Sequence, residues 1–268
     1  MNLDIFELLT YFIIYSILGW IMESTVRTVC EKKIINTGFL NGPCCPIYGI
    51  GAIIMLIFLG RFEDKPIILF LLSLLILTIW EYVVGVLLEK IFKTKYWDYS
   101  NQKFNFQGRI CLLNSICWGI LGLVFIKILH PVVQNILSKV DKNVIFYTIV
   151  LATVILIVDA IISVVNVKNI KTTLKKVEEM NKEIREKLKE LRKLKLKKEK
   201  EREKSTIEGV QRLIEKLKRK RNRTILRLYK NVYRLKKAFP DINAKEITEV
   251  LNKKIELIKK REKNKKKT

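Results

Sequence analysis

Long runs of apolar residues, separated by short polar links, make up most of residues 1–165. A helix rises about 1.5 Å per residue and the hydrocarbon core of a bilayer is about 30 Å thick, so roughly 20 apolar residues are needed to cross it. The candidate spans cover residues 5–26, 45–60, 66–88, 110–129 and 144–165. The second run is the shortest and is the best candidate for a re-entrant segment. The pattern predicts an all-α integral membrane bundle of about five transmembrane helices.

After residue 165 the pattern changes to charged residues with a sparse apolar stripe. The stripe first recurs at alternating spacings of four and three residues, which is the pattern of a coiled-coil seam. The seam positions are Ile170, Leu174, Val177, Asn181, Ile184, Leu188 and Leu191. Asn181 is polar, and a polar residue in such a seam often fixes register and strand number. The sequence therefore predicts a second domain over residues 166–268, a basic helical tail whose first part resembles a coiled coil.

The rest of the tail is patterned less clearly. A weaker apolar run lies between Val210 and Leu235 and is interrupted by Arg221. The segment NAKE at 243–246 resembles a capping box and predicts the start of a last helix. Residues 259–268 are almost all basic or polar, so we expect them to be disordered.

The tail carries nearly all of the charge of the chain. Of the 51 Lys and Arg and the 26 Asp and Glu, residues 1–165 hold only 13 and 11, and the formal net charge is +25. Self-association through the seam, or an intrachain helical hairpin, is the simplest interpretation of the tail. Contact with anionic lipid headgroups is the next, because each basic residue near such a surface contributes roughly 1 kcal/mol. Nucleic acid is a weaker candidate, since the tail has few aromatic residues and no known nucleic-acid-binding fold.

Basic residues in the links predict the orientation of the bundle. The links after the first and third runs hold eight Lys and Arg, whereas those after the second and fourth hold four. Links with more basic residues lie in the cytoplasm as a rule. The tail then falls inside and, with five spans, the N-terminus falls outside. The start of the chain, MNLDIFELL, is acidic and no small-residue cleavage site follows, so we expect no cleaved signal peptide.

The segment GPCCPIYG at 42–49 leads into the second run. It contains Gly42, Pro43, Cys44, Cys45, Pro46, Tyr48 and Gly49. The residue before each proline is pushed to an extended conformation, and a proline suits the first turn of a helix. Small residues at helical spacing then allow another helix to approach closely. A rigid loop feeding a tightly packed helix is the favoured interpretation. A redox or metal site is the alternative, although adjacent cysteines form only a strained ring and cytoplasmic thiols stay reduced.

Polar side chains within the apolar runs are candidate functional residues, because they are costly in a membrane. These candidates for a polar lining or for ion pairs are Glu23, Arg27, Glu81, Glu89, Asn114 and Asp159. Glu23 precedes Arg27 by four residues, the favourable order for a helical ion pair. Glu81 lies about two turns inside its run, and Arg27 or Arg109 are candidate partners. Asp159 has no basic residue nearby in the sequence.

The loop YWDYSNQKFNFQGR, which ends at residue 109, is rich in aromatic residues. Its candidate residues are Trp97, Asp98, Tyr99, Asn105 and Arg109. One interpretation is an interfacial belt, where Trp and Tyr rings lie between lipid and water. The other is a loop folded against residues 42–49, forming a cytoplasmic vestibule or a docking surface for an ATPase.

Four sequence blocks are long and unusual: YSILGWIMES, NTGFLNGPCCPIYGIGAI, EYVVGVLLEKIF and YWDYSNQKFNFQGRICLLNSICWGILG. Over roughly residues 8–130 they resemble the bacterial family of putative ABC-transporter type IV membrane proteins, also called a putative ABC transporter permease family. The resemblance implies a multi-pass component of the cell membrane that works with a separate ATPase. Where the family pattern has a basic residue before Gly-Phe-Leu, this chain has Thr37, so we do not expect a charge role at that point. The basic tail is an addition outside the family pattern.

Motifs for catalysis are not found in the sequence. No glycine is followed by lysine, so there is no P-loop, and a single histidine excludes an HExxH zinc site. There is no G-x-S-x-G elbow either. We therefore expect no enzyme activity, cofactor or metal in this chain. The favoured function is a permease-like transporter component that acts as a homo-oligomer to enclose a path. The rival is a non-transporting scaffold that oligomerises or binds lipids or partners through its tail. A membrane enzyme that acts on lipids is less favoured.

Overall fold

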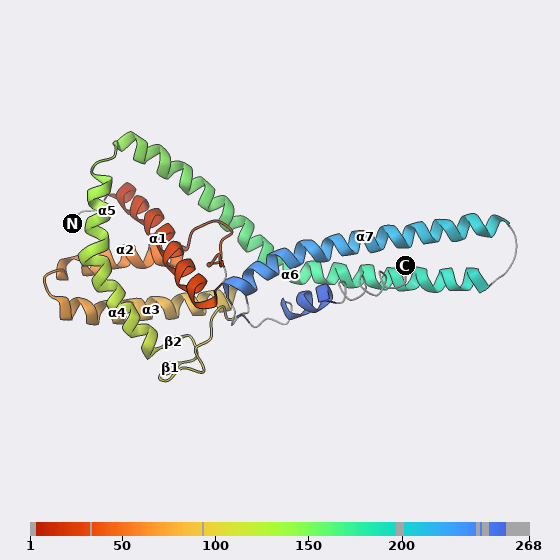
Figure 1. Ribbon diagram of the computed structural model, residues 1–268, viewed down its shortest axis with the longest axis horizontal. Coiled ribbons are helices and arrows are strands. Elements are labelled where there is room, and N and C mark those ends of the chain that lie inside the picture. The colour runs from red at the N-terminus through yellow and green to blue at the C-terminus, as the bar shows by residue number, and fades with distance from the viewer. Residues whose placement is uncertain are drawn as a thin grey trace. The chain divides into compact units, whose positions relative to one another are not determined.

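The protein is described by a computed structural model covering residues 4–32, 34–92, 94–196, 201–239, 242 and 247–255. The described chain is almost entirely helical (Figure 1), which confirms the predicted all-α class. The elements are α1 (Ile5–Glu31), α2 (Pro46–Leu59), η1 (Gly60–Phe62), α3 (Pro66–Phe92), β1 (Asn105–Phe106), β2 (Ile110–Cys111), α4 (Leu112–Val124), η2 (Phe125–Leu129), α5 (His130–Leu137), α6 (Lys142–Leu196) and α7 (Glu201–Ala238). Residues 247–255 are also helical. Strands β1 and β2 form one short antiparallel pair.

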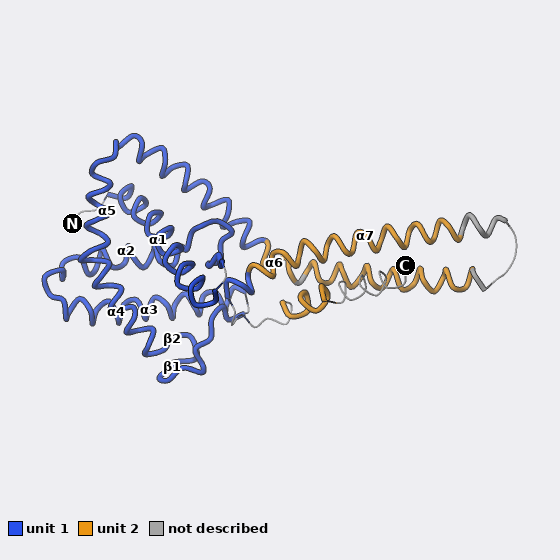
Figure 2. Tube along the Cα trace, viewed as in Figure 1, with its two compact units in different colours: residues 1–165, 235–243 blue, residues 166–234, 244–268 orange. Residues whose placement is uncertain are grey.

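The trace divides into two compact units (Figure 2). Unit 1 comprises residues 1–165 and 235–243, and unit 2 comprises residues 166–234 and 244–268. Unit 1 holds the apolar helices and, from the far end of the chain, a short segment after Arg234. That short segment places residues of the tail in the same unit as the predicted membrane bundle.

Four helices of the described chain are long and apolar enough to cross a membrane. They are Ile5–Glu31, Pro66–Phe92, Leu112–Leu137 and Lys142–Ile170. Large apolar side chains on them, such as Leu71, Ile120 and Ile155, are more than half exposed, as lipid-facing side chains are. The remaining predicted span, over 45–60, is the shorter apolar helix Pro46–Phe62.

Helix α2 begins halfway along α1 rather than at its end. Its 14 residues make it about 21 Å long, short of the roughly 30 Å of a bilayer core. The Cys45 amide donates to the Ser16 carbonyl at 2.9 Å, and Ser16 lies near the middle of α1. Residues 34–45 therefore return from the end of α1 to its middle. This loop and α2 together pass from one end of the unit to the other (Figure 1).

Glycines allow the helices of unit 1 to pack closely in two pairs. A Cβ at Gly49 of α2 would lie 2.1 Å from the Ser16 Oγ of α1. A Cβ at Gly122 of α4 would lie 2.2 Å from the Ser73 Oγ of α3. Between these pairs lies a buried cluster of Tyr11, Tyr15, Ala52, Met55, Leu56, Leu59, Leu69, Leu77, Phe125, Ile126 and Val133. The small residues around Gly49 thus serve helix packing.

In unit 2 the tail forms a helical hairpin within one chain. Seam residues Leu174, Val177 and Ile184 of α6 are buried, as are several apolar residues of α7. The Arg221 guanidinium donates to the Asn181 side-chain oxygen at 3.1 Å. The polar residue of the first seam and the arginine that interrupts the second run therefore meet. The capping box predicted at 243–246 and the predicted disorder of 259–268 lie outside the described residues.

Candidate functional site

A cleft of about 920 Å³ lies in unit 1, among α1, α2, α3, α4 and the loops around residues 40 and 97. Its walls are mostly apolar and aromatic. Three of the chain's four tryptophans, Trp80, Trp97 and Trp118, line it. The charged side chains in the lining are Glu23, Arg27 and Glu81. Large apolar clefts with a few placed polar groups are the usual form of a small-molecule site.

Glu81 of α3 is held by three neutral donors. The Trp118 indole donates to one carboxylate oxygen at 2.9 Å, and the Asn114 amide donates to the other at 2.9 Å. The Tyr99 hydroxyl donates to that second oxygen at 3.2 Å. Asn114 also donates to Tyr99 at 2.8 Å, so the four side chains form one network. Glu81 is only 4% exposed, and neither Arg27 nor Arg109, its candidate partners from the sequence, forms a salt bridge with it among the described residues.

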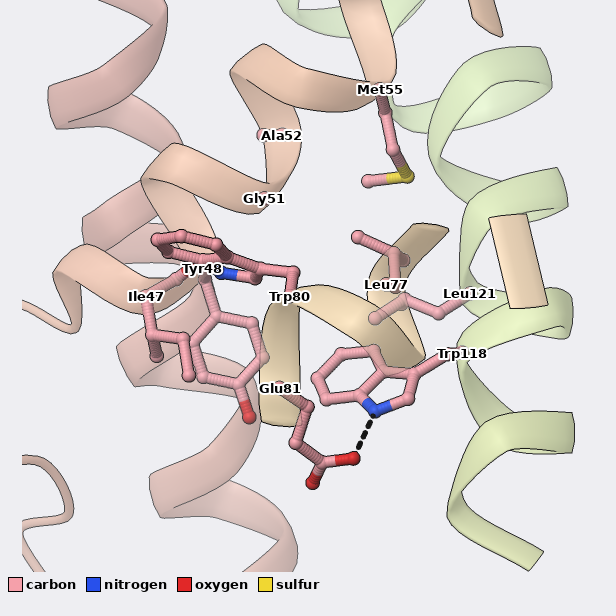
Figure 3. A pocket seen from close by; sticks show the side chains of 10 residues that line it. All are labelled: Ile47, Tyr48, Gly51, Ala52, Met55, Leu77, Trp80, Glu81, Trp118 and Leu121. Carbon is pink, nitrogen blue, oxygen red and sulfur yellow. Dashed lines mark hydrogen bonds between the residues drawn. The ribbon is translucent and has the colours of Figure 1, made fainter. Parts of the chain in front are cut away.

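A small cavity of about 30 Å³ lies between α2, α3 and α4, and Glu81 is one of the residues that line it. Figure 3 shows Trp80 and Trp118 on two sides of it and the Tyr48 hydroxyl extending towards the same side as Glu81. The Trp80 indole donates to the Ile47 carbonyl at 3.0 Å, which fixes this ring against α2. A cavity of this size is large enough for a water molecule, since roughly 10–15 Å³ suffices.

Glu23 and Arg27 of α1 line the same cleft, but they are partnered differently from the sequence expectation. The salt bridge of Arg27 is with Glu31, at 3.2 Å, instead of with Glu23. Arg27 also donates to the backbone carbonyl of Ala238. The hydrogen bonds of the Arg27 guanidinium are therefore made with Glu31 and Ala238, and it forms no salt bridge with Glu23. The Glu23 carboxylate instead interacts with the Tyr48 hydroxyl of α2.

The end of α7 and the residue that follows it lie beside the cleft. Phe239 lines it and packs edge-on against Tyr96, with ring centroids 4.9 Å apart and an interplanar angle of 88°. The Lys237 ammonium donates to the Ile34 carbonyl of the loop after α1. These residues belong to unit 1. A part of the tail is thereby built into the cleft.

The aromatic loop before β2 is rigid and internally bonded. The Trp97 indole donates to the Arg109 carbonyl at 2.9 Å, and the Asn105 amide donates to the Gln102 carbonyl at 2.8 Å. Asp98 accepts from the Ser100 hydroxyl at 2.5 Å, and this bond lowers the pKa of Asp98. Burial and the adjacent Glu81 raise the pKa of Tyr99. Trp97 and Tyr99 reach the cleft, while Asp98 and Asn105 shape the loop.

Arg109 and Glu89 anchor this loop to α3. The guanidinium donates twice to one Glu89 oxygen, at 2.7 and 3.1 Å. It also lies over the Tyr82 ring, 5.8 Å from the centroid. This charge-assisted pair holds the end of the loop against α3.

Asp159 of α6 binds the loop at residues 41 and 42. The Gly42 amide donates to one carboxylate oxygen at 2.7 Å. The Asn41 side chain donates to the other at 2.7 Å, and the Asn41 amide at 3.2 Å. Within a membrane, the N–H and C=O groups of non-helical backbone must find their hydrogen-bond partners in the protein itself. Asp159, which has no basic partner in the sequence, thus serves to hold a loop that enters the bundle.

Cys44 and Cys45 are held as thiols. Cys45 is buried, and burial raises its pKa to about 12. Burial likewise raises the pKa of Cys44. The thiolate is the form that attacks and that binds metals, so both side chains are poorly suited to either role. Among the described residues no three His, Cys, Asp or Glu side chains are grouped as a metal site would require.

Cys45 should therefore react slowly with alkylating reagents. At pH 7.5 we expect N-ethylmaleimide to modify Cys45 at least about 100-fold more slowly than the exposed Cys30, since the thiolate fraction falls tenfold per pKa unit. Mass spectrometry of timed samples in detergent measures both rates at once. Equal rates would show that the thiol is accessible and reactive after all.

Several residues of the cleft, and one residue of the loop that binds Asp159, were not identified from the sequence. Trp80 and Trp118 lie in apolar runs, where an aromatic residue is ordinary, and only their indole N–H groups are distinctive. Asn41 stands beside the glycine of a turn motif, so its bond to Asp159 could not be distinguished from turn chemistry. Phe239 follows α7, more than 140 residues from the Tyr96 ring that it contacts. Their partners are distant in the sequence, so no local pattern could identify them.

Comparisons with known proteins place the chain in a family. A search of curated proteins and a search of solved structures found no match. A family model described as Putative ABC-transporter type IV matches residues 10–164, which are more than half of the chain and overlap each of the four described helices that are long and apolar enough to cross a membrane. The chain therefore belongs to the Putative ABC-transporter type IV family and is a multi-pass membrane protein.

Proposed function

We propose that the chain is the permease-like membrane component of an ABC-type transporter and works with a separate ATPase subunit. The observation that carries this proposal is the cleft of about 920 Å³, which lies within a bundle of apolar helices and is lined by the buried Glu81. A scaffold has no need of such a space. Membership of the family supports the same function, and the sequence has no P-loop with which to bind ATP.

The ATPase would dock on the aromatic loop, which we expect to face the cytoplasm. Phe104 is 81% exposed at its tip, next to the short β1–β2 pair. The Arg109–Glu89 pair and the bonds of Trp97 hold the base of this loop to the cleft. A partner bound at the tip could therefore act on the residues that surround Glu81. An exposed aromatic residue on a rigid loop is a typical anchor of a protein interface.

Purification of the full chain from its native host in mild detergent, followed by mass spectrometry, tests the proposal. We expect a stoichiometric ATPase subunit with the wild type, and its loss with Phe104→Ala. The matched control is Lys103→Ala, which changes an exposed neighbour on the same loop and should retain the subunit. Recovery of the chain alone in every preparation would contradict the proposed function.

The alternative is a non-transporting scaffold that oligomerises or binds anionic lipid through its tail. The helical hairpin of unit 2 favours this alternative, because the basic helices of the tail form a unit distinct from the apolar helices. A scaffold predicts that removal of the tail abolishes the complexes recovered from the host. A transporter component predicts that the ATPase still binds the bundle when residues 244–268 are removed.

A further inference from the structure

The cleft continues onto surface that a membrane would cover. Its lining includes Val26, Leu87 and Ile120, whose side chains are 56%, 51% and 53% exposed. All three lie on helices that are long and apolar enough to cross a membrane. In a bilayer this side of the cleft meets acyl chains, so an occupant needs a hydrocarbon part.

The polar end of the cleft carries more negative than positive charge. Glu23 and Glu81 both line it. Glu81 accepts hydrogen bonds from Trp118, Asn114 and Tyr99, which are neutral and bring no positive charge to it. Arg27 also lines the cleft, but it is already paired with the carboxylate of Glu31. An occupant that brings a positive charge is therefore favoured over one that brings a negative charge.

Aromatic rings surround this end and favour a soft organic cation. Tyr48, Trp80 and Trp118 stand beside Glu81, and the face of a tryptophan ring attracts ammonium groups most strongly. A metal ion fits less well, because N–H donors occupy the oxygens of Glu81 and the described residues hold no group of three ligands. An anionic headgroup would need free guanidinium donors, and those of Arg27 bind Glu31 and the Ala238 carbonyl.

We propose that the cleft binds an amphipathic organic cation, with its amine or quaternary ammonium head between Glu23 and Glu81 and its hydrocarbon chain along α3 and α4. This proposal deepens the proposed function, since the cation would be the transported substrate, but binding itself requires neither an ATPase nor transport. The ring faces would hold the head, and exposed apolar side chains of α3 and α4, such as Leu87 and Ile120, would hold the hydrocarbon chain.

Tryptophan fluorescence measures the binding directly, because three of the four tryptophans line the cleft. The full chain in dodecyl maltoside micelles is titrated with decyltrimethylammonium, with anionic decyl sulfate and with neutral decanol. We expect a saturable change with the cation alone, and binding at least about 10-fold weaker in Glu81→Gln. Glu63→Gln, an exposed carboxylate at a turn far from the cleft lining, is the matched control and should bind as the wild type does.

Each outcome decides the proposal. Equal changes with all three probes, stronger binding of decyl sulfate, or unchanged binding in Glu81→Gln would overturn it. If Glu81→Gln does not fold, the same loss is required of Glu23→Gln, and normal binding by that variant overturns the proposal. If an ATPase co-purifies but the protein binds no cation, the proposed substrate class is wrong and the transporter function still stands. If the protein binds the cation but no ATPase co-purifies, the transporter function is wrong and the cation site still stands.

Discussion

Replacing Gly49 with alanine is expected to destabilise the bundle by at least about 2 kcal/mol, because the new methyl group has no room. Its carbon would lie 2.1 Å from the Ser16 Oγ and 2.5 Å from the Phe12 carbonyl oxygen. The Phe12 oxygen belongs to the backbone of α1, and it also accepts the Ser16 hydroxyl at 2.7 Å. The Ser16 hydroxyl can turn aside only by breaking its hydrogen bond to Phe12, and the Phe12 backbone oxygen cannot yield unless α1 and α2 move apart.

Thermal unfolding in detergent, followed by circular dichroism, measures this effect. We expect Tm to fall by at least about 5 °C, given a few degrees per kcal/mol for a chain of this size. The control is Gly60→Ala, where an added Cβ meets no atom of the described residues within 4 Å. A Gly49→Ala variant with the Tm of Gly60→Ala would mean that the helices do not approach as the structure has them.

Replacing Asp159 with alanine is expected to have an effect of similar size for a different reason. The change leaves the amides of Asn41 and Gly42 without their acceptor and removes one of the two acceptors of the Asn41 side chain. Hydrogen bonds to a charged group contribute about 1.5–3 kcal/mol each and are not additive, so the total loss should be about 2–4 kcal/mol. Since these donors lie in a loop that enters the bundle, lipid cannot replace the lost acceptor.

A lower Tm together with faster alkylation of Cys44 identifies release of the loop, because Cys44 stands two residues after Gly42. Ser163→Ala is the control: it removes one acceptor of Asn41, at 2.8 Å, and leaves the carboxylate in place. We expect it to cost less than about 1 kcal/mol. If Ser163→Ala and Asp159→Ala lower Tm equally, the carboxylate does not hold the loop.

The apolar runs show which features of the fold can be predicted from the sequence alone. Four of the predicted spans match the four long apolar helices, because helical hydrogen bonds are local and composition decides which segments avoid water. The second run was recognised as short, but its start at the middle of α1 depends on the loop of residues 34–45. That loop is stabilised by contacts with Asp159 and Ser24, which local composition does not encode.

For the carboxylates too, the sequence indicated which residues are candidates, and only the structure showed their partners. Their positions within apolar runs marked Glu23, Glu81 and Asp159 as candidates, but the expected ion pair of Glu23 with Arg27 is not the salt bridge that forms. The guanidinium of Arg27 can reach an acid four residues on either side, and the Ala238 carbonyl draws it towards Glu31. Only the folded chain decides between two acids at equivalent helical spacing.

The sequence by itself determined the helical class, the apolar segments, the basic tail, the missing P-loop and the family. These properties depend on composition, on short-range spacing and on contiguous blocks of residues. The tertiary structure decided which groups surround Glu81, whose partners lie 18, 33 and 37 residues away, and it placed Asn41 at Asp159 across 118 residues. It also built Phe239 into the cleft. A buried carboxylate must find donors, but which donors it finds is set by the packing of whole helices.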